Sequence, residues 1–331
     1  MTGLPLELLR AIDTGSSGDA WNAVVSHAWA TCSRRLATQV PAEIARRDRD
    51  LAGLDLLLAT GAADLWEAFD QDVEKTSDAL VAWWTSRGPG RAVLILDGLS
   101  LREAPVLTQE AERHGFVVCG ARATGAELPA ETLPFARALG FPQRSALENN
   151  DGGKGHRLPG ATTDSGSMPW EDCAARIGSE PDWVLWHHWP DDRLHDLASA
   201  GQGLNTLAAE CIRRLSDDSF WSLVGRLSTG RCVLVTSDHG YAATGTFHDS
   251  SDQQGKYLKG LFGGGRSRPA SEERAPWVPP VDLTLESRHG RHRYAVGRRK
   301  WKSQGGYPTL THGGLSVLEV LSPFIELSRP A

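Results

Sequence analysis

A short apolar run that ends in metal-binding side chains constrains this chain most. Residues 233–236 are apolar and partly β-branched, and after one serine they are followed by Asp238-His239-Gly240. Such a run is typical of a strand buried on both faces of a parallel sheet. Open α/β sheets bind ligands beyond the carboxyl ends of their strands, so Asp238 and His239 are candidate metal ligands. An Asp-His pair that only hydrogen-bonds a loop is commoner, so the prediction needs partners elsewhere.

A second run of the same kind lies earlier in the chain. Residues 92–96 are apolar and lead directly into Asp97-Gly98. A helix predicted over 103–114 joins this strand to another at 116–120, which is the repeating unit of a parallel sheet. Asp97 and Asp238 should then project from the same sheet edge. A carboxylate there is more often a helix N-cap than a cation ligand, and both interpretations stay open.

Composition and helical spacing set the fold class and the compartment. From residue 4 to about 85 apolar residues recur at helical spacing, and further strands are predicted at 182–188, 281–286 and 293–296. We therefore expect an α/β fold, in which helices flank a mostly parallel central sheet and a helical region, 1–88, precedes it. The 331 residues carry a formal charge of −6 and five scattered cysteines without a CxxC spacing. These features, with no signal-peptide pattern and no long apolar span, predict a cytoplasmic protein without a membrane anchor.

A threonine at a predicted helix start is the candidate nucleophile. Thr132 precedes Pro134, which a helix tolerates only in its first turn, so Thr132 falls near the N-cap. Most threonines in this setting only cap their own helix. A hydroxyl at a helix start can also attack a phosphoryl group held by backbone N–H groups. Thr124 and Ser100 compete for this role, and placement alone favours Thr132.

Three more residues could complete a metal site. Asp191 and His195 are four apart at the start of a predicted helix, so both lie on one face within reach of a single ion. This spacing is common by chance, and a surface histidine near an N-terminal aspartate is the simpler interpretation. His312 precedes Gly313-Gly314, whose lack of side chains lets the backbone approach a site closely. The segment after His312 is expected to enter a helix that ends near Ser322-Pro323.

Two polar segments and one basic segment are predicted around the sheet edge. Residues 145–168 and 245–280 are rich in Gly, Ser and Asp, so we expect mobile loop insertions that could cover a substrate. Arg298, Arg299 and Lys300 belong to the most basic stretch of the chain. Such a stretch is usually a solvated face, but beside a metal site it would suit an anionic substrate.

The ordered set of these residues resembles a known metal-binding signature. Asp97, a hydroxyl near Thr132, Asp191-x-x-x-His195, Asp238-His239 and His312-Gly313-Gly314 follow one another as in the alkaline phosphatase superfamily. More narrowly, the chain from about Arg91 to Leu327 resembles the PglZ family, whose members occur in BREX-type bacteriophage-defence loci and as phosphodiesterase output domains. The strongest parts of the match are the Asp238-His239-Gly240-Tyr241 strand end and the segment from His312 to Pro323.

The resemblance implies a catalytic domain over 89–331 with an alkaline-phosphatase-like fold and two bound divalent ions, zinc or else manganese. It implies that Asp191, His195 and His312 hold one ion, while Asp97, Asp238, His239 and the Thr132 hydroxyl hold the other. One departure concerns Arg102: the family often has Asp-x-Leu-Arg after the first strand, whereas Gly-Leu-Ser-Leu separates Asp97 from Arg102 here. The chain has no Cys-x-Pro-x-Arg motif, so it does not resemble the sulfatases.

The expected function is that of a hydrolase, a metal-dependent phosphodiesterase acting on nucleotide or nucleic-acid diesters in antiviral defence, with other defence proteins as expected partners. Two alternatives stay open. One is a vestigial module that contacts DNA or partner proteins in a defence assembly through the helical region and the basic segment. The other is a metal-dependent phosphosugar mutase, for which the chain has no room for a large inserted domain.

Overall fold

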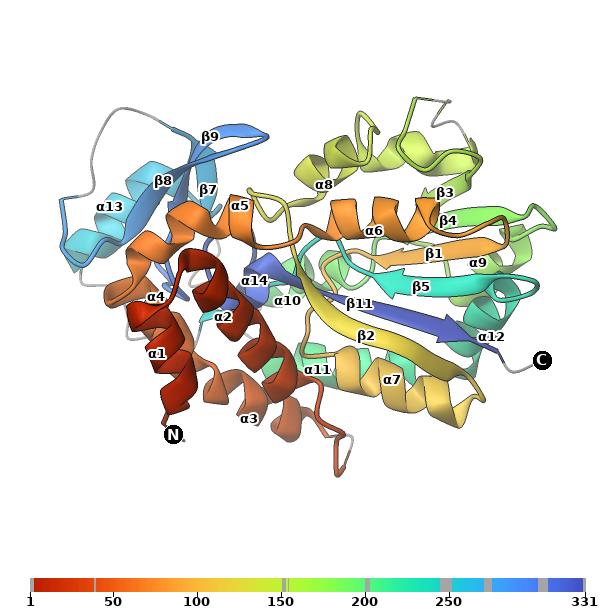
Figure 1. Cartoon of the computed structure of the whole chain (residues 1–331), viewed down its shortest axis with the longest axis horizontal. Coiled ribbons are helices and arrows are strands. Elements are labelled where there is room, and N and C mark those ends of the chain that lie inside the picture. The colour runs from red at the N-terminus through yellow and green to blue at the C-terminus, as the bar shows by residue number, and fades with distance from the viewer. Residues whose placement is uncertain are drawn as a thin grey trace.

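A six-stranded sheet forms the centre of the computed structural model (Figure 1), which describes residues 3–38, 40–150, 153, 155–199, 203–244, 252–270, 276–302 and 309–329. The strand order is β2-β11-β5-β1-β4-β3. The strands are β1 (Arg91–Leu96), β2 (Val117–Gly125), β3 (Thr162–Gly166), β4 (Asp182–His187), β5 (Cys232–Thr236) and β11 (Leu321–Ser328). β1 pairs in parallel with β4 and β5, β3 pairs in parallel with β4, and β11 runs antiparallel to β2 and β5. The predicted mostly parallel sheet is confirmed.

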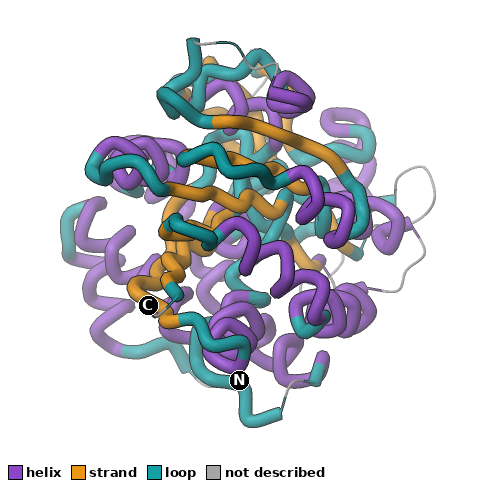
Figure 2. Tube along the Cα trace, turned by 90° about the vertical axis from the view of Figure 1, so that its right-hand side faces the viewer, coloured by secondary structure: helices purple, strands orange, loops and turns teal. Residues whose placement is uncertain are grey.

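Helices cover both faces of this sheet (Figure 2). They are α6 (Thr76–Thr85), α7 (Ala104–Arg113), α8 (Thr132–Ala138), α9 (Trp170–Arg176), α10 (Asp191–Ser199), α11 (Gly203–Leu215) and α12 (Asp218–Leu227). Successive side chains of β1 point to opposite faces. Leu94 packs among residues of α7, α9, α11 and α12, while Val93 and Ile95 pack against α6 and α8. None of the helices in the described ranges is long and apolar enough to span a membrane.

The amino-terminal region is helical, as predicted. It comprises α1 (Leu6–Thr14), α2 (Ser17–Cys32), α3 (Pro41–Asp50), α4 (Ala52–Thr60), the 3-10 helix η1 (Ala63–Ala68) and α5 (Phe69–Asp72). Its apolar residues do not form a core of their own. Trp21, Leu54 and Trp66 share one buried cluster with Val317 and Leu321, from the segment that follows His312. The helical region therefore packs directly against a segment of the expected catalytic domain, and a boundary at residue 88 stays a prediction.

A smaller antiparallel sheet lies at one end of the molecule, beside α13 (Asp252–Phe262) (Figure 1). Its order is β7-β9-β8, from Ser267–Pro269, Gly290–Ala295 and Asp282–Ser287. The two predicted strands at 281–286 and 293–296 correspond to β8 and β9. The predicted insertion at 245–280 thus contributes a helix and a strand, although 245–251 and 271–275 lie outside the described residues. A two-stranded ladder of β6 (Ala242–Ala243) and β10 (Leu310–Thr311) links the main sheet to this end.

The segment expected to be a loop at 145–168 is more ordered than predicted. It contains most of the 3-10 turn η2 (Arg144–Asn150) and the edge strand β3, which pairs with β4 from Thr162 to Gly166. Residues 151, 152 and 154 of this segment lie outside the described residues. The strand was missed because its sequence, Thr-Thr-Asp-Ser-Gly, has no apolar alternation.

The expected carboxyl-terminal helix is mostly a strand. Only α14 (Val317–Val320) is helical, and β11 then begins at Leu321 and enters the middle of the main sheet. Proline is rare in a central strand because it cannot donate a hydrogen bond to the ladder. In the structure Pro323 pairs with Ala123 of β2, and pairing with β5 begins only at Phe324, so the missing N–H does not interrupt that second ladder.

Candidate metal centre

The carboxyl ends of β1 and β5 bring Asp97, Asp238 and His239 together, as the sequence predicts. Backbone bonds fix their positions: the Gly98 N–H donates to Asp238 Oδ1 at 3.0 Å, and the Asp191 N–H donates to the Asp97 carbonyl at 3.0 Å. Gly98 has a φ of +72°, and a Cβ there would lie 3.3 Å from the Asp191 Cβ. Only glycine fits this turn without strain, and the turn sets Asp191 beside Asp97.

Asp191, His195 and His312 form a second group. Asp191 is the first residue of α10, and His195 one turn later places Nε2 3.2 Å from Asp191 Oδ2. His312 Nε2 lies 3.6 Å from Asp191 Oδ1 and 3.4 Å from His195 Nε2. The expectation that the Asp191–His195 spacing puts both side chains on one helix face is met. His312, far away in the sequence, closes the group.

The two glycines after His312 are needed for this approach. Gly313 has a φ of +96°, and a Cβ there would lie 2.8 Å from Glu131 Oε1. A Cβ at Gly314 would lie 2.7 Å from Arg266 Nε and 2.9 Å from the Ala295 carbonyl oxygen. Any side chain would push the turn away, so the glycines allow His312 to reach the centre.

The ligand atoms fall into two overlapping sets. One comprises Asp191, His195 and His312, and the other Asp97, Asp191 and His239, with the atoms of each set within 4.8 Å of one another. Asp238 lies beside the second set, with Oδ2 3.4 Å from His239 Nε2. Asp191 therefore belongs to both sets, whereas the resemblance had assigned it to one ion only.

Several polar atoms of the centre lack the partners that buried groups normally have. Asp191 Oδ1, Asp238 Oδ2 and His239 Nε2 are buried and accept or donate no hydrogen bond among the described residues. A buried charged atom without a partner is costly, and carboxylate and imidazole atoms in these numbers are typical ligands of zinc or manganese. The residues therefore fit two divalent cations at positions that share Asp191.

The electrostatics of the centre show an excess of negative charge. Burial raises the pKa of Asp97 well above its usual value, and the nearby Asp238 and Asp191 raise it further. Burial alone would lower the pKa of His239, but Asp238 and Asp97 raise it to about 9. Both raised pKa values have the same cause: a proton held by Asp97 or His239 offsets the negative charge of the clustered carboxylates. A bound cation would offset that charge equally well.

Thr132 is one of two hydroxyls that contact this cluster; the other, Ser237, donates to Asp238 Oδ1 at 3.3 Å and to the His239 carbonyl at 2.7 Å. Thr132 is the first residue of α8, and its Oγ1 donates to Asp97 Oδ1 at 3.4 Å. The two competing hydroxyls are buried in other contacts. Thr124 bonds Thr76 at 2.8 Å, and Ser100 accepts from Arg102 Nη1 at 2.9 Å. Position therefore favours Thr132 over both alternatives.

Arg144 contacts the cluster and was not singled out in the sequence. Its guanidinium forms an ion pair with Asp97 Oδ2, and Trp186 Nε1 donates to the same oxygen at 3.1 Å. Neither residue stands in a motif. Arg144 opens a stretch that reads as a loop, and its position depends on the fold of η2.

Comparison with known proteins gives only distant likenesses. No protein-family model matches the chain, and no curated protein matches its sequence. Two solved structures of murine ectonucleotide pyrophosphatase/phosphodiesterase 5 are similar to it at 13% identity. The inactive form in complex with AMP has a TM-score of 0.46 over 74% of this chain and 89% of that chain. The other has a TM-score of 0.40 over 73% and 88%. The function proposed below therefore depends on the geometry of the metal centre.

The basic segment divides into a buried and a partly exposed part. Arg298 is fully buried, and its guanidinium contacts Asp48 at 2.8 Å and Asp55 at 2.5 Å. Because it is buried, Arg298 is not positioned to bind a substrate, and this part of the prediction is wrong. A basic stretch in a sequence does not show which of its side chains point inward. Arg299 and Lys300 are partly exposed and line a small pocket with Thr311, next to His312. Substrate binding by these two stays a prediction.

The role of Arg102 is structural. Its Nε lies 2.9 Å from Asp48 Oδ1, and Nη1 donates to the Tyr241 carbonyl at 2.7 Å. Arg102 is buried and contacts the His239-Gly240-Tyr241 turn through the Tyr241 carbonyl. Its hydrogen bonds to the described residues do not include Asp97. At this altered spacing from Asp97, Arg102 stabilises the turn that carries His239.

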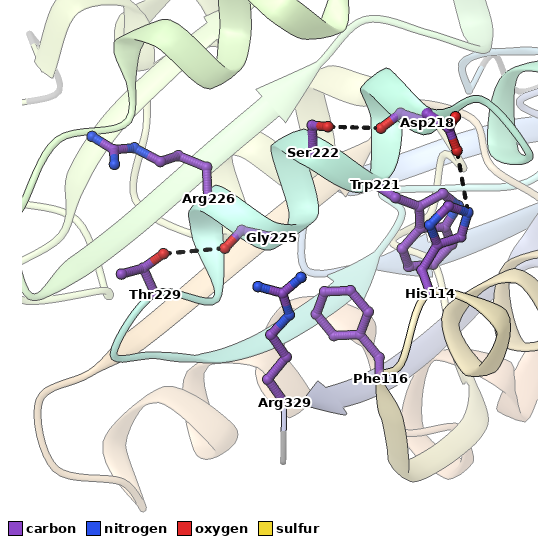
Figure 3. A pocket seen from close by; sticks show the side chains of 9 residues that line it. All are labelled: His114, Phe116, Asp218, Trp221, Ser222, Gly225, Arg226, Thr229 and Arg329. Carbon is purple, nitrogen blue, oxygen red and sulfur yellow. Dashed lines mark hydrogen bonds and ion pairs between the residues drawn. The ribbon is translucent and has the colours of Figure 1, made fainter. Parts of the chain in front are cut away.

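A surface pocket of about 540 Å³ lies away from the metal centre (Figure 3). Residues of α12 line it together with Phe116, which precedes β2, and Arg329, which follows β11. α12 leads into the start of β5, so this pocket lies at the amino-terminal edge of the parallel strands. The hydroxyls of Ser222, on α12, and of Thr229, just after it, donate to backbone carbonyls of α12. None of the predicted site residues lines this pocket.

Proposed function

We propose that this protein is a metal-dependent phosphoesterase, and more specifically a phosphodiesterase acting on nucleotide or nucleic-acid diesters. One observation carries the proposal: the Thr132 hydroxyl lies 3.4 Å from Asp97, at the edge of two overlapping sets of cation ligands. A nucleophile beside a pair of cation sites is the arrangement that phosphoryl transfer requires.

Each residue of the candidate site has a distinct proposed role. Asp191, His195 and His312 would hold one cation, and Asp97, Asp238 and His239 the other, with Asp191 placed to contact both. Two divalent cations, zinc or manganese, would polarise the phosphoryl group and make the Thr132 oxygen a better nucleophile. Asp97 orients that oxygen through its hydrogen bond. The buried position of Asp97 and His239 excludes water from the inner side of the site.

The reaction would proceed in two displacements at phosphorus. In the first, the Thr132 oxygen bonds to phosphorus as the bond to the leaving alcohol breaks, and the proton lost by Thr132 balances the one gained by the alcohol. In the second, water breaks the bond between phosphorus and Thr132, which releases a phosphomonoester and restores the hydroxyl.

The biological setting rests on sequence resemblance alone. Likeness to PglZ proteins supports a cytoplasmic role in BREX-type antiviral defence, beside other defence proteins. Partly exposed Arg299 and Lys300 near His312 support an anionic substrate. The alternative of a vestigial interaction module is less well supported. Five of the six predicted ligands fall into two groups that could hold a cation, Asp238 lies beside one of them, and Arg298 is buried rather than exposed to DNA.

The test is hydrolysis of bis(4-nitrophenyl) phosphate, a diester, against 4-nitrophenyl phosphate, a monoester, by protein loaded with zinc or manganese. We expect turnover of the diester and a loss of about 10³-fold or more in kcat for Thr132→Ala, with metal content unchanged. Thr229→Ala, which removes a threonine hydroxyl in the turn after α12, should keep full activity. Metal-loaded protein that hydrolyses neither ester would refute the proposal.

A further inference from the structure

Arg144 brings a permanent positive charge to the metal centre. Arg144 forms an ion pair with Asp97. The Arg144 side chain is 24% exposed to solvent, whereas the Asp97 carboxylate is fully buried. Within the described ranges, no other arginine or lysine forms an ion pair with any of the six predicted ligands. Arg144 therefore connects the inside of the centre with its solvent side.

The turn that carries Arg144 is fixed to the sheet. Leu147 is buried, and its carbonyl accepts a bond from Thr163 Oγ1 at 2.9 Å. The Asn149 N–H donates to Asp164 Oδ1 at 3.1 Å, and Asn150 Oδ1 accepts from the Thr163 N–H at 3.1 Å. Asn149 and Asn150 both have positive φ, of 52° and 61°. Such backbone is strained outside glycine, so these bonds to β3 must hold the turn in place.

Arg144 and the nucleophile flank the same carboxylate. The Thr132 hydroxyl bonds Asp97 Oδ1, while the Arg144 guanidinium bonds Asp97 Oδ2. A phosphorus atom that Thr132 attacks must lie within bonding distance of its oxygen, on the solvent side of Asp97. The guanidinium, on the other side of that carboxylate, is then within reach of a phosphoryl oxygen, and its planar fork matches two such oxygens.

The charge balance of the centre identifies the ligand class. Three carboxylates and an ionised threonine carry four negative charges, which two divalent cations would offset when the histidines are neutral. The guanidinium of Arg144 then remains as the net positive charge of the centre. A phosphodiester group carries one negative charge at neutral pH, so the two match.

We propose that Arg144 is a substrate-binding residue that holds a non-bridging oxygen of a monoanionic phosphodiester beside Thr132. This inference rests on the proposed phosphodiesterase function and adds the residue that selects the charge of the substrate. Arg144 exchanges part of its contact with Asp97 for the phosphoryl oxygen when substrate enters. The turn of η2 limits how far the guanidinium can move.

The experiment measures binding without turnover. Zinc-loaded Thr132→Ala protein is titrated with bis(4-nitrophenyl) phosphate by calorimetry, and zinc content is measured in parallel. Adding Arg144→Ala should raise the Kd about tenfold or more, the usual effect of losing a hydrogen bond to a charged group, while zinc content stays the same. Arg144→Lys in the same background should recover part of the affinity, because it keeps the charge but loses the fork.

Arg176→Ala is the matched control. Arg176 also pairs with a buried aspartate near this turn, Asp164, at 3.0 Å, but it makes no contact with the predicted ligands. Its removal should leave the Kd unchanged. An unchanged Kd for Arg144→Ala, or a loss of zinc together with affinity, would overturn the assignment of Arg144. If wild-type protein hydrolyses no phosphate ester and Thr132→Ala binds no diester, the proposed function itself fails.

Discussion

Two buried clusters of charge contact the segment from His239 to Tyr241, and they are built differently. In the first, Asp48 and Asp55 meet Arg102 and Arg298, and all four side chains are almost completely buried. In the second, the candidate metal centre, three aspartates lie among histidines, and only Asp97 pairs with an arginine among the described residues. The first cluster balances its charges within the chain, whereas in the second two carboxylate oxygens have no hydrogen-bond partner among the described residues.

The difference shows which buried carboxylates are structural and which are suited to ligands. Burial would raise the pKa of Asp48, but Arg298 and Arg102 hold it below its usual value. Asp55, with one guanidinium partner, has a raised pKa because burial outweighs Arg298. Burial and two neighbouring aspartates raise the pKa of Asp97 much further. A buried charge needs a counter-charge, and at Asp97 the chain supplies too little of it.

Exchanging one carboxylate in each cluster should give the largest contrast. Asp48→Asn leaves two buried guanidiniums without their shared partner, so we expect the free energy of unfolding to fall by about 3–5 kcal/mol. Asp97→Asn should change it less, or raise it, when a chelator is present, because it removes charge from an overcrowded group. Urea unfolding followed by circular dichroism measures both. Equal losses in the two variants would mean that the clusters do not differ in this way.

Removing the cation should destabilise the protein through the candidate metal centre and not through the cluster of Asp48 and Asp55. Zinc at about 100 times its Kd should raise the free energy of unfolding by about 2.7 kcal/mol relative to protein in a chelator. Asp97→Asn should lose most of this gain, since a ligand is missing, whereas Asp48→Asn should keep it. Thermal unfolding with and without zinc provides the measurement. The same gain in Asp97→Asn and wild type would place the cation elsewhere.

The pH dependence of stability should report on Glu103, which lies beside the first cluster. Burial raises its pKa to about 7, although it accepts a bond from Tyr241 Oη at 2.7 Å. Between pH 4.5 and 7 the folded protein therefore holds a proton that the unfolded chain has lost, so stability falls as pH rises. Relative to Glu103→Gln, wild type should lose about 3 kcal/mol across this range.

Glu112→Gln, on the exposed side of α7, is the control for this titration. Its stability should follow wild type at every pH. Parallel curves for wild type and Glu103→Gln would show that Glu103 is not the group that titrates.

The main strands and the predicted ligands could be read from local sequence. The runs before Asp97 and Asp238 are mainly apolar, which favours burial on both faces, and the positions of the predicted ligands follow from where the strands end. The polar edge strand β3 and the proline-containing strand β11 could not be recognised in this way. Both exist because neighbouring strands offer ladders to them, which is a property of the assembled sheet.

By itself the sequence determined the α/β pattern, the order of the ligands and the helix that carries Asp191 and His195. Tertiary structure alone decided that Arg298 points inward to Asp48 and Asp55, that Asp191 lies between two ligand sets, and that Arg144 reaches Asp97. The physical reason is the sequence distance over which each kind of interaction acts. Periodicity and spacing act over a few residues, whereas the partner of a buried charge is set by which distant elements pack together.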